Sequence, residues 1–363
     1  MSTKLSWIFL SLLFGVKAMA FGDIRLVVGT YTDGGSHGIY SFSLNEETGA
    51  SKLLDSLQLK NPSYLVPFRE GRCLLAVSEM SDSTASLNAI RFDRTTGHMV
   101  LINSQPTGGE DPCYVATNGK TALTANYTGG SLSVFPILRD GSLGSRTQLF
   151  HGHTGGPDLK RQSSAHIHCA RFLDKAEVLA TDFSADAILR FRYEAGQLTP
   201  LGVAGRLDSG SAPRHLAFSR DGRTVYAMSE IAGTVTVFRN EGGALKKIQV
   251  IASDTVGGEG GADIHLSPDG RFLYSSNRLK ADGIAVFKVH AQSGKLEKVG
   301  YQYTGLHPRN FNITPNGRLM LVACRDSNVI QVYQIDPRSG MLTDLHKDIH
   351  LSKPVCVQFV SHF

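Results

Sequence analysis

The sequence contains no cluster of lysines and arginines. Its formal net charge is +5, part of which comes from Lys4 and Lys17 near the N-terminus, and the other basic residues are spread along the chain. Nucleic-acid-binding proteins concentrate positive charge in a patch or stripe. The distribution therefore argues against a nucleic-acid partner and favours a few arginines directed at a small anion.

Cysteine is scarce, and no Cys-x-x-Cys pair is present. The five cysteines fall in segments that we expect to be strands, where cysteine acts as a small apolar residue. The glycine-rich stretch 257–261 is followed by no helical pattern, so it is not a phosphate-binding loop. No metal motif is visible, and we predict neither a metal nor a cofactor.

No apolar stretch is long enough to cross a membrane comfortably. The longest lies near the N-terminus at residues 5–16, whereas a spanning helix needs ~20 residues. Lys4 before it and Ala18-Met19-Ala20 after it are typical of a secretory signal peptide. We expect residues 1–20 to be removed after Ala20 and the product to be exported, to the periplasm or outside the cell. An uncleaved anchor is the alternative.

What the sequence does contain is one sequence pattern that is repeated seven times. Each copy has a short strand that begins with Pro or a substitute, a turn, a more apolar strand, a polar loop and a third strand. The equivalent first positions are Pro62, Pro112, Ile167, Pro213, Gly261, Pro308 and Pro354, which are 50, 55, 46, 48, 47 and 46 residues apart. Such a period predicts a β-propeller, in which each repeat forms one four-stranded blade. We therefore predict an all-β fold, with residues 21–363 as a single seven-bladed domain.

The best-defined repeat indicates where the strands of a blade lie. Residues 214–219 form the expected innermost strand, residues 224–229 the second, 234–238 the third and 245–250 the outermost. Asp221-Gly222 between the first two is a strong hairpin signal, and similar turns recur in other repeats. The fourth repeat departs from the pattern, because its turn at residues 173–175 lacks the glycine and is one residue shorter.

The two ends of the chain are complementary. The N-terminal region begins with the equivalent of a second strand, residues 26–30, and the C-terminus supplies a lone first strand, residues 354–359. Pairing these segments completes the first blade and removes two exposed sheet edges. We expect the propeller to be closed in this way.

Charged side chains recur at one register of the repeat. The first and second strands of a blade are antiparallel, so the start of the first lies beside the end of the second, at one mouth of the central channel. The residues predicted at this mouth include His168, Arg214 and Arg309 from first strands, and Glu79, Tyr127, Asp182, Glu230, Arg278 and Arg325 from second strands. A structural repeat does not need such side chains there, so they indicate a functional site.

These motifs resemble one known family. The most specific are Pro213-Arg214-His215 with Glu230 sixteen residues after Arg214, residues 275–278, and Pro308-Arg309, while residues 166–169 and 125–127 add to the match. The chain resembles the lactonase family of seven-bladed propellers, which includes bacterial 6-phosphogluconolactonases and fungal carboxymuconate-lactonising enzymes. The resemblance implies roles for His168, Arg214, Glu230 and Arg278.

Residue chemistry suggests what each group does. His168 is the natural general base, because an ordinary histidine is largely neutral at pH 7. Arg214 and Arg278 can hold a phosphate or carboxylate or polarise a lactone carbonyl. Glu230 either orients these groups or acts as the acid or base itself, and bracing of neighbouring blades by Glu230 and Arg278 is the structural alternative. The further substrate-binding candidates are Arg309, His166, Asp182 and Asn126.

The sequence thus predicts hydrolysis of a small anionic sugar lactone. By resemblance, this is 6-phospho-D-glucono-1,5-lactone, converted to 6-phosphogluconate. A muconate-type lactonising cycloisomerase and a non-catalytic binding or scaffold protein remain the alternatives. A calcium site built from Glu79, Asn126 and Glu230 is disfavoured by the neighbouring arginines. The oligomeric state stays open.

Overall fold

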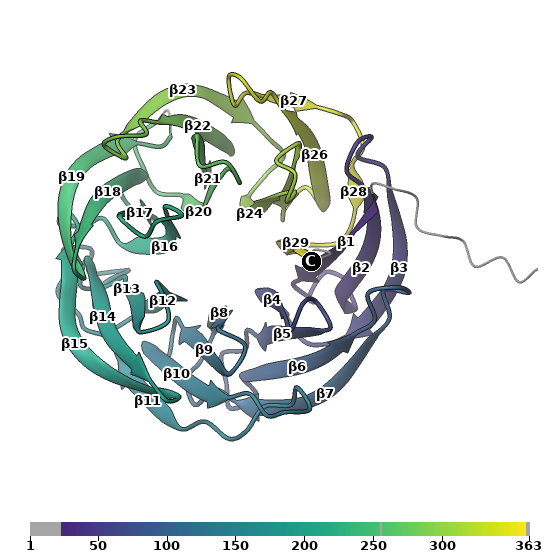
Figure 1. Ribbon diagram of the computed structural model, residues 1–363, viewed down its shortest axis with the longest axis horizontal. Coiled ribbons are helices and arrows are strands. Elements are labelled where there is room, and N and C mark those ends of the chain that lie inside the picture. Colours follow the sequence, from purple (N-terminus) through teal and green to yellow (C-terminus); the bar gives the residue numbers. More distant parts are fainter. Residues whose placement is uncertain (1–22, 255, 361–363) are drawn as a thin grey trace, which may run out of the picture.

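The computed structural model describes residues 23–254 and 256–360, and in this part of the chain seven β-sheets surround a central channel (Figure 1). Each sheet is one blade, and its first strand faces the channel. The expected seven-bladed propeller is confirmed. The expected leader, residues 1–20, lies outside the described residues, so the division at residue 20 stays a prediction.

The blades follow one another in chain order. Blade 1 consists of β29 (Pro354–Val360), β1 (Asp23–Thr30), β2 (Gly38–Asn45) and β3 (Ser51–Gln58). Blade 2 consists of β4 (Leu65–Phe68), β5 (Cys73–Ser78), β6 (Ser86–Phe92) and β7 (Met99–Pro106). Blade 3 consists of β8 (Pro112–Thr117), β9 (Thr121–Asn126), β10 (Ser131–Pro136) and β11 (Gln148–His151). Blade 4 consists of β12 (Ile167–Phe172), β13 (Glu177–Asp182), β14 (Ala187–Glu194) and β15 (Gln197–Arg206).

The other three blades complete the ring. Blade 5 consists of β16 (Pro213–Phe218), β17 (Thr224–Ser229), β18 (Thr234–Glu241) and β19 (Ala244–Ala252). Blade 6 consists of β20 (Gly261–Leu266), β21 (Phe272–Asn277), β22 (Gly283–Val289) and β23 (Leu296–Tyr303). Blade 7 consists of β24 (Pro308–Ile313), β25 (Leu319–Cys324), β26 (Val329–Ile335) and β27 (Leu342–Asp344), with β28 (Ile349–His350) also paired to β26.

The ring closes by pairing the two ends of the chain. β29 lies antiparallel to β1, with Leu26 opposite Phe359 and Val28 opposite Val357. Figure 1 shows the C-terminal strand inserted at the channel, beside the N-terminal blade. The predicted closure is confirmed, because the N-terminal segment would otherwise lack an inner neighbour.

The hairpins between the first two strands have the expected turn chemistry. Gly222, Gly270 and Gly317 have φ of 67°, 73° and 74°, a left-handed conformation that favours glycine. In blade 5 the Asp221 carboxylate accepts a hydrogen bond from Arg223 N at 3.0 Å. The shortened turn of blade 4 uses Asp174 in the same way, accepting from Ala176 N at 2.7 Å without a glycine.

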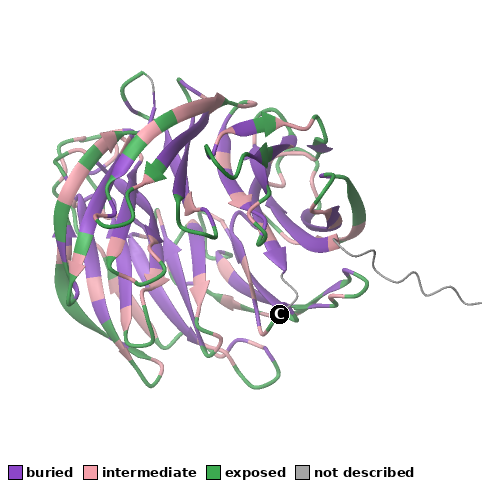
Figure 2. Cartoon of the chain, turned by 45° about the horizontal axis from the view of Figure 1, so that its top comes forward, coloured by how far each residue is buried: buried purple, intermediate pink, exposed green. Residues whose placement is uncertain are grey.

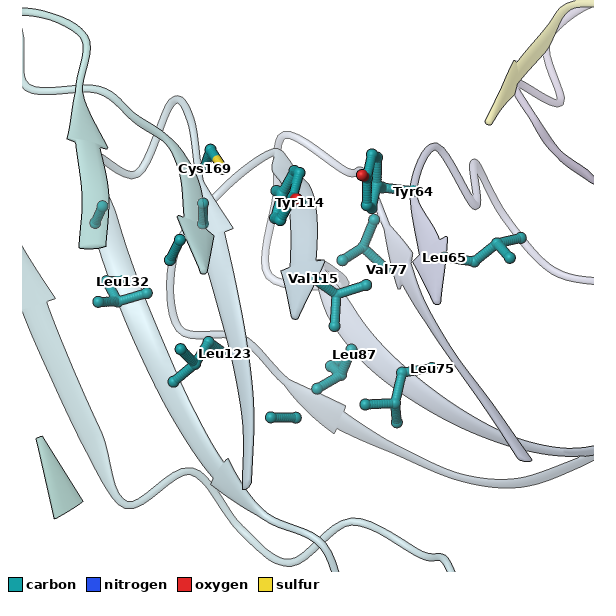
Figure 3. Close-up of a cluster of buried hydrophobic side chains, with 14 of the residues drawn as sticks. Tyr64, Leu65, Leu75, Val77, Leu87, Tyr114, Val115, Leu123, Leu132 and Cys169 are labelled. Atoms are coloured by element: carbon teal, nitrogen blue, oxygen red, sulfur yellow. The ribbon is translucent and has the colours of Figure 1, made fainter. Parts of the chain in front are cut away.

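The hydrophobic core lies between the blades. Figure 2 shows buried residues along the strands and exposed ones at the rim and in loops. One cluster joins blades 2, 3 and 4 through residues such as Leu75, Leu123 and Cys169 (Figure 3). All five cysteines are buried, reduced and located in strands, as expected. Within the described residues, no helix has the length and apolar character needed to cross a bilayer.

Candidate active site at one mouth of the channel

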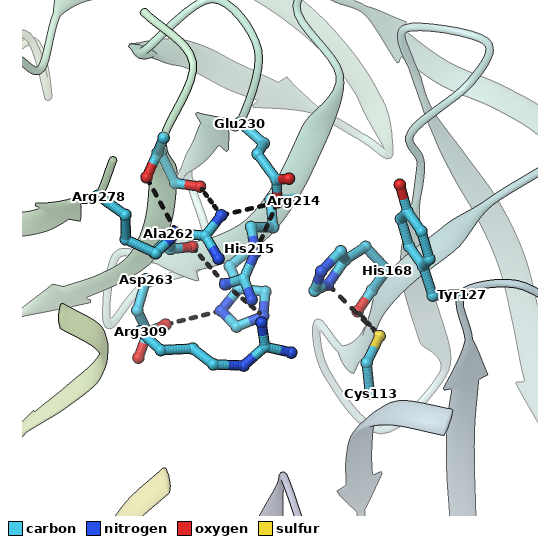
Figure 4. Close-up of polar contacts among 12 residues, drawn as sticks. Cys113, Tyr127, His168, Arg214, His215, Glu230, Ala262, Asp263, Arg278 and Arg309 are labelled. Atoms are coloured by element: carbon cyan, nitrogen blue, oxygen red, sulfur yellow. Dashed lines mark hydrogen bonds and ion pairs between the residues drawn. The ribbon is translucent and has the colours of Figure 1, made fainter. Parts of the chain in front are cut away.

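A β-bulge near the start of most inner strands directs side chains to the same mouth. The pairing register shifts between Pro112 and Tyr114, between Ile167 and Cys169, between Pro213 and His215, and between Pro308 and Asn310. The residues at these shifts are Cys113, His168, Arg214 and Arg309. Bulges commonly re-aim side chains beside active sites, and here they converge on the channel (Figure 4).

A cavity of about 330 Å³ opens at this mouth. It is lined by Glu79, Asp111, Cys113, Tyr127, Thr128, Arg161, His168, Glu230, Arg278 and Arg309. Larger hollows of 570 and 710 Å³ lie between hairpin loops at the rim, but they do not gather a comparable set of buried acid–base groups. The channel mouth is therefore the candidate site.

Glu230 is held by three guanidinium groups. Its Oε1 lies 2.7 Å from Arg161 Nη2, and its Oε2 lies 3.0 Å from Arg214 Nε and 3.1 Å from Arg278 Nη2. Burial alone would raise the pKa of this carboxyl, but Arg278, Arg214 and Arg161 outweigh it and hold the pKa far below its usual value. Glu230 is therefore a carboxylate at neutral pH and accepts hydrogen bonds without donating any.

Backbone carbonyls fix the two buried arginines beside Glu230. Arg214 Nη1 donates to Ala262 O at 2.7 Å, while Arg278 Nε donates to Gly260 O and Nη2 to Gly261 O, both at 3.1 Å. A side chain at position 260 would place Cβ only 2.0 Å from the Arg278 carbonyl oxygen, so this approach requires glycine. Burial and the nearby cations lower the pKa of Arg278 to about 9, against the attraction of Glu230.

A second ion pair occupies another part of the mouth. Arg309 Nη2 lies 3.5 Å from Glu79 Oε2, and Tyr31 donates to Glu79 Oε1 at 2.8 Å. The Arg309 guanidinium also lies over the Tyr31 ring, 5.3 Å from its centroid. Among the described residues, Glu79 engages only one nitrogen of the Arg309 guanidinium, which leaves its other N–H groups for a ligand.

His168 lies in a cationic, dehydrated environment. Burial lowers the pKa of its imidazole well below 6.5, and Arg214, His215 and Arg309 lower it further. Its Nδ1 lies 3.6 Å from Cys113 Sγ, and no other described side chain bonds its Nε2. Burial raises the pKa of the Cys113 thiol well above 9, so the thiol stays protonated. His168 is therefore a neutral imidazole that borders the cavity.

Comparison with known proteins places the chain in a family. The family described as "Lactonase, 7-bladed beta-propeller" matches residues 25–359. The chain belongs to this lactonase family. A 6-phosphogluconolactonase of Bacillus subtilis is 34% identical over 343 residues, which covers 92% of this chain and 97% of that protein.

Solved structures agree with this assignment. A Bacteroides uniformis protein, named as a candidate 6-phosphogluconolactonase, is 54% identical with a TM-score of 0.91 over 93% of this chain and 99% of its own. The periplasmic gluconolactonase of Pseudomonas aeruginosa is 33% identical with a TM-score of 0.88, covering 93% and 99%. The expectation of an enzyme of the lactone-hydrolase class is confirmed.

The structure of this lactonase brings most of the predicted site residues together. His168, Glu230, Arg278 and Arg309 line the cavity, and Arg214 contacts Glu230 from outside the lining. Arg325, also expected near this mouth, is not part of the cavity lining. It contacts Asp326 at 2.6 Å and, at 3.1 Å, His307, whose other ring nitrogen lies 3.4 Å from Arg278. The catalytic roles assigned from sequence remain predictions.

Three of the predicted substrate-binding residues lie outside the cavity lining. Asn126 is buried and donates to Ser131 and Ser133 at 3.0 and 2.9 Å. His166 stacks on Tyr127, with centroids 4.1 Å apart, and its Nδ1 lies 2.8 Å from Tyr127 O. These two residues brace the wall of the site.

Asp182 differs from the expected register by one residue. It pairs with Ile167, as Ser229 pairs with Pro213, so Phe183 and not Asp182 is the equivalent of Glu230. The shortened turn of blade 4 moves the end of the second strand by one residue relative to blade 5, whereas the expected position of Asp182 required a shift of two. The Asp182 carboxylate instead accepts from His153 N at 2.8 Å.

Arg161 is the site residue that sequence reasoning missed. It lies in the long connection between β11 and β12, donates to Tyr127 Oη at 3.0 Å and to Glu230, and lies 5.2 Å from the Phe183 ring centroid. Blade 4 thus replaces a charged strand-end residue with an arginine carried by a loop. The only signal in the sequence was the length of the preceding repeat, 55 residues from Pro112 to Ile167, which contains the long loop.

No group of three or more His, Cys, Asp or Glu residues arranged to hold a metal occurs in residues 23–254 and 256–360. The hypothetical calcium ligands are already engaged: Glu79 with Tyr31 and Arg309, Asn126 with serines, and Glu230 with arginines.

Proposed function

We propose that this lactonase hydrolyses 6-phospho-D-glucono-1,5-lactone to 6-phosphogluconate at the channel mouth. The observation that carries the proposal is a neutral histidine beside a cavity with several guanidinium groups. A sugar-sized ring fits a volume of about 330 Å³, and arginine is well suited to bind phosphate through paired N–H groups. Relatives named 6-phosphogluconolactonase support the choice of substrate.

His168 is the proposed general base. Its Nε2 takes a proton from water while the water oxygen bonds to the lactone carbonyl carbon, and the oxyanion that forms is stabilised by Arg309. Collapse breaks the ring C–O bond, and the departing alkoxide takes the proton back from the imidazolium. The new carboxylic acid then ionises, which releases one proton per turnover.

Glu230 is the proposed positioning residue. Its depressed pKa makes it a poor general acid, which favours the orienting role among those left open by sequence. Its carboxylate pairs with Arg161, Arg214 and Arg278 and so holds the three guanidinium groups in fixed positions, despite their mutual repulsion. A bound phosphate would also offset the positive field that depresses the His168 pKa, making His168 a stronger base in the complex.

The test compares hydrolysis of the phosphorylated lactone and of free gluconolactone by the purified protein, corrected for spontaneous opening. The proposal expects the phosphorylated substrate to have the higher kcat/KM. Arg161→Gln should raise KM for that substrate by about 10-fold or more, the scale of one charge-assisted hydrogen bond, and leave gluconolactone nearly unchanged. No turnover of either lactone would instead favour a lactonising or binding role.

Free gluconolactone is the second candidate substrate. The periplasmic gluconolactonase of P. aeruginosa covers 93% of the chain, and the leader-like residues 1–20 suggest the same compartment for this protein. We therefore also propose export with cleavage after Ala20. N-terminal sequencing of the protein recovered from a periplasmic or extracellular fraction tests this, and an intact Met1 in the cytosolic fraction would contradict it.

A further inference from the structure

A second polar cavity lies at the other end of the channel. It has a volume of about 390 Å³, and its lining includes Tyr64, Tyr114, Arg171, His265, Asn312 and Gln358. Most of these residues lie near the ends of inner strands, whereas the candidate active site lies at their beginnings. Arg171 is three residues after His168 on β12, about 10 Å along the strand.

A buried polar plug separates the two cavities. Its centre is Asp263, which bonds His215 Nδ1 at 2.7 Å, His265 Nε2 at 2.9 Å and the Asn310 amide. His215, Asp263 and Asn310 are at most 4% exposed. The plug explains why the second cavity is a distinct space. Both oxygens of the Asp263 carboxylate already accept hydrogen bonds within the plug.

The second cavity carries a positive charge without a counter-charge. None of its lining residues is Asp or Glu. Arg171 Nη1 donates to Leu216 O at 2.6 Å, and the guanidinium lies 5.0 Å from the Phe218 ring centroid, but within the described residues it forms no ion pair. Arg161, Arg214, Arg278 and Arg309 at the other mouth all have carboxylate partners. Arg171 is half-buried, and a charge partly withdrawn from water is more favourable when it is paired, which points to an external anion.

Hydrogen-bond donors surround this arginine. The hydroxyls of Tyr64 and Tyr114 belong to stacked rings whose centroids are 4.2 Å apart, and they hydrogen-bond to each other. One of the two O–H groups is thus used within the pair, and the other remains as a donor. Gln358 Oε1 accepts from Asn312 at 3.2 Å, which leaves the Gln358 amide N–H groups as donors. His265 uses Nε2 for Asp263 and retains Nδ1 for a ligand.

We propose that the second cavity is a binding site for a small hydroxylated carboxylate. One guanidinium suits a monoanion better than a phosphate dianion, and the phenol, amide and imidazole groups suit alcohol hydroxyls. The site is separate from the proposed catalytic residues, so its occupancy does not depend on the proposed reaction.

The experiment is calorimetric titration of D-gluconate into the full protein and its variants. For a ligand of this size we expect a Kd of about 1 mM or tighter. Arg171→Met should abolish gluconate binding. If gluconate also binds at the active-site mouth, the variant should lose one of two binding events. Its lactone turnover should stay within about twofold of the wild-type rate. Arg192→Met, at an exposed position of β14, is the matched control and should bind as the wild type does.

Tyr64→Phe provides a second variant that keeps the ring packing. It should weaken gluconate binding about 5-fold, as expected for one hydrogen bond, while exposed Tyr303→Phe should not. A wild-type protein that binds no gluconate, or a folded Arg171→Met variant with an unchanged isotherm, would overturn the proposal. Equally tight binding of inorganic phosphate at the Arg171-dependent site would overturn the preference for carboxylates. If the wild-type protein hydrolysed no lactone, that result would refute the proposed function but not the proposed binding site.

Discussion

In this lactonase, the pKa values of single residues are shifted by the charges around them. Glu230 and His168 are both buried at the same mouth, but arginines act on them in opposite ways. The guanidiniums lower the pKa of Glu230 by stabilising its anion, and they lower the pKa of His168 by opposing its cation. At pH 7 the result is a carboxylate and a neutral imidazole at the same mouth, so His168 is free to accept a proton while Glu230 holds the arginines in place.

Replacing His168 tests the base directly. His168→Ala should reduce kcat/KM by about 10²- to 10⁴-fold, the usual contribution of general acid–base catalysis, with little change in Tm. His151→Ala, at an exposed position of β11, is the control and should keep wild-type rates. A loss of less than threefold in folded His168→Ala would rule out the assigned role.

The pH dependence of turnover follows from the His168 pKa. Because this pKa lies well below 6.5 in the free protein, His168 stays neutral as the pH falls past 6.5. With free gluconolactone, which has no titrating phosphate, kcat/KM should therefore stay level down to pH 6 and decline only at lower pH. A decline centred at 6.5 or above would show that the surrounding arginines do not depress the His168 pKa.

Glu230 links stability to pH. Its pKa in the folded protein lies below the ordinary 4.5, so its stabilising contribution is present above pH 4.5 and is lost as the pH falls through the folded pKa. At pH 7, Glu230→Gln should lower the free energy of unfolding by about 3–5 kcal/mol, because it leaves Arg214 and Arg278 without their buried counter-charge. Urea unfolding at pH 7 and pH 3.5 should give a smaller difference between wild type and variant at the lower pH, and an equal difference would contradict the linkage.

At the scale of elements, the same contact anchors blade 5 to blade 6 and blade 6 to blade 7. Tyr226 on β17 donates to Gly294 O in the β22–β23 turn at 2.9 Å, and Tyr274 on β21 donates to Gly340 O in the β26–β27 turn at 3.0 Å. Both phenols are almost fully buried. The second strand of one blade is thus tied to the outer hairpin of the following blade.

Removing one of these hydroxyls should destabilise the ring modestly. Tyr226→Phe should lower the free energy of unfolding by about 1 kcal/mol, the net value of a buried hydrogen bond, and leave kcat/KM unchanged because the contact lies far from the mouth. Tyr303→Phe, on an exposed ring, should change neither. Equal chemical-denaturation midpoints for Tyr226→Phe and the wild type would show that the contact does not couple the blades.

At the scale of the whole molecule, the fold depends on pairing its two ends. β29 supplies the inner strand of the blade formed by β1, β2 and β3. Without it, the inner edge of β1 would be unpaired and the cluster around Leu26, Val28 and Phe42 would face the channel. Sheet edges of this kind promote aggregation.

Truncation tests the closure. A chain that ends at Ser352 should be recovered mainly as aggregate in size-exclusion chromatography, whereas a chain that ends at Val360 should elute as the full-length protein does. If the chain without β29 remained monodisperse with an unchanged Tm, the closure would not be needed for stability.

The sequence determined the architecture and most of the mouth. The repeat predicted seven blades, and residues 224–229 were predicted as a strand that β17 matches. Residues at equivalent positions of a repeat share a place in the hydrogen-bond ladder, so register alone brought His168, Arg214, Glu230, Arg278 and Arg309 to one end of the channel.

Tertiary structure decided what register cannot specify. Arg161 reaches Glu230 from a loop that has no ladder to fix it. Phe183 takes the position expected for Asp182 because the shortened turn moves the strand end by one residue and not by two. The uncompensated charge of Arg171 likewise emerged only when the inner strands were assembled around the plug at Asp263. Repetition fixes which positions are equivalent, whereas loop paths and partners across the channel depend on packing between distant blades.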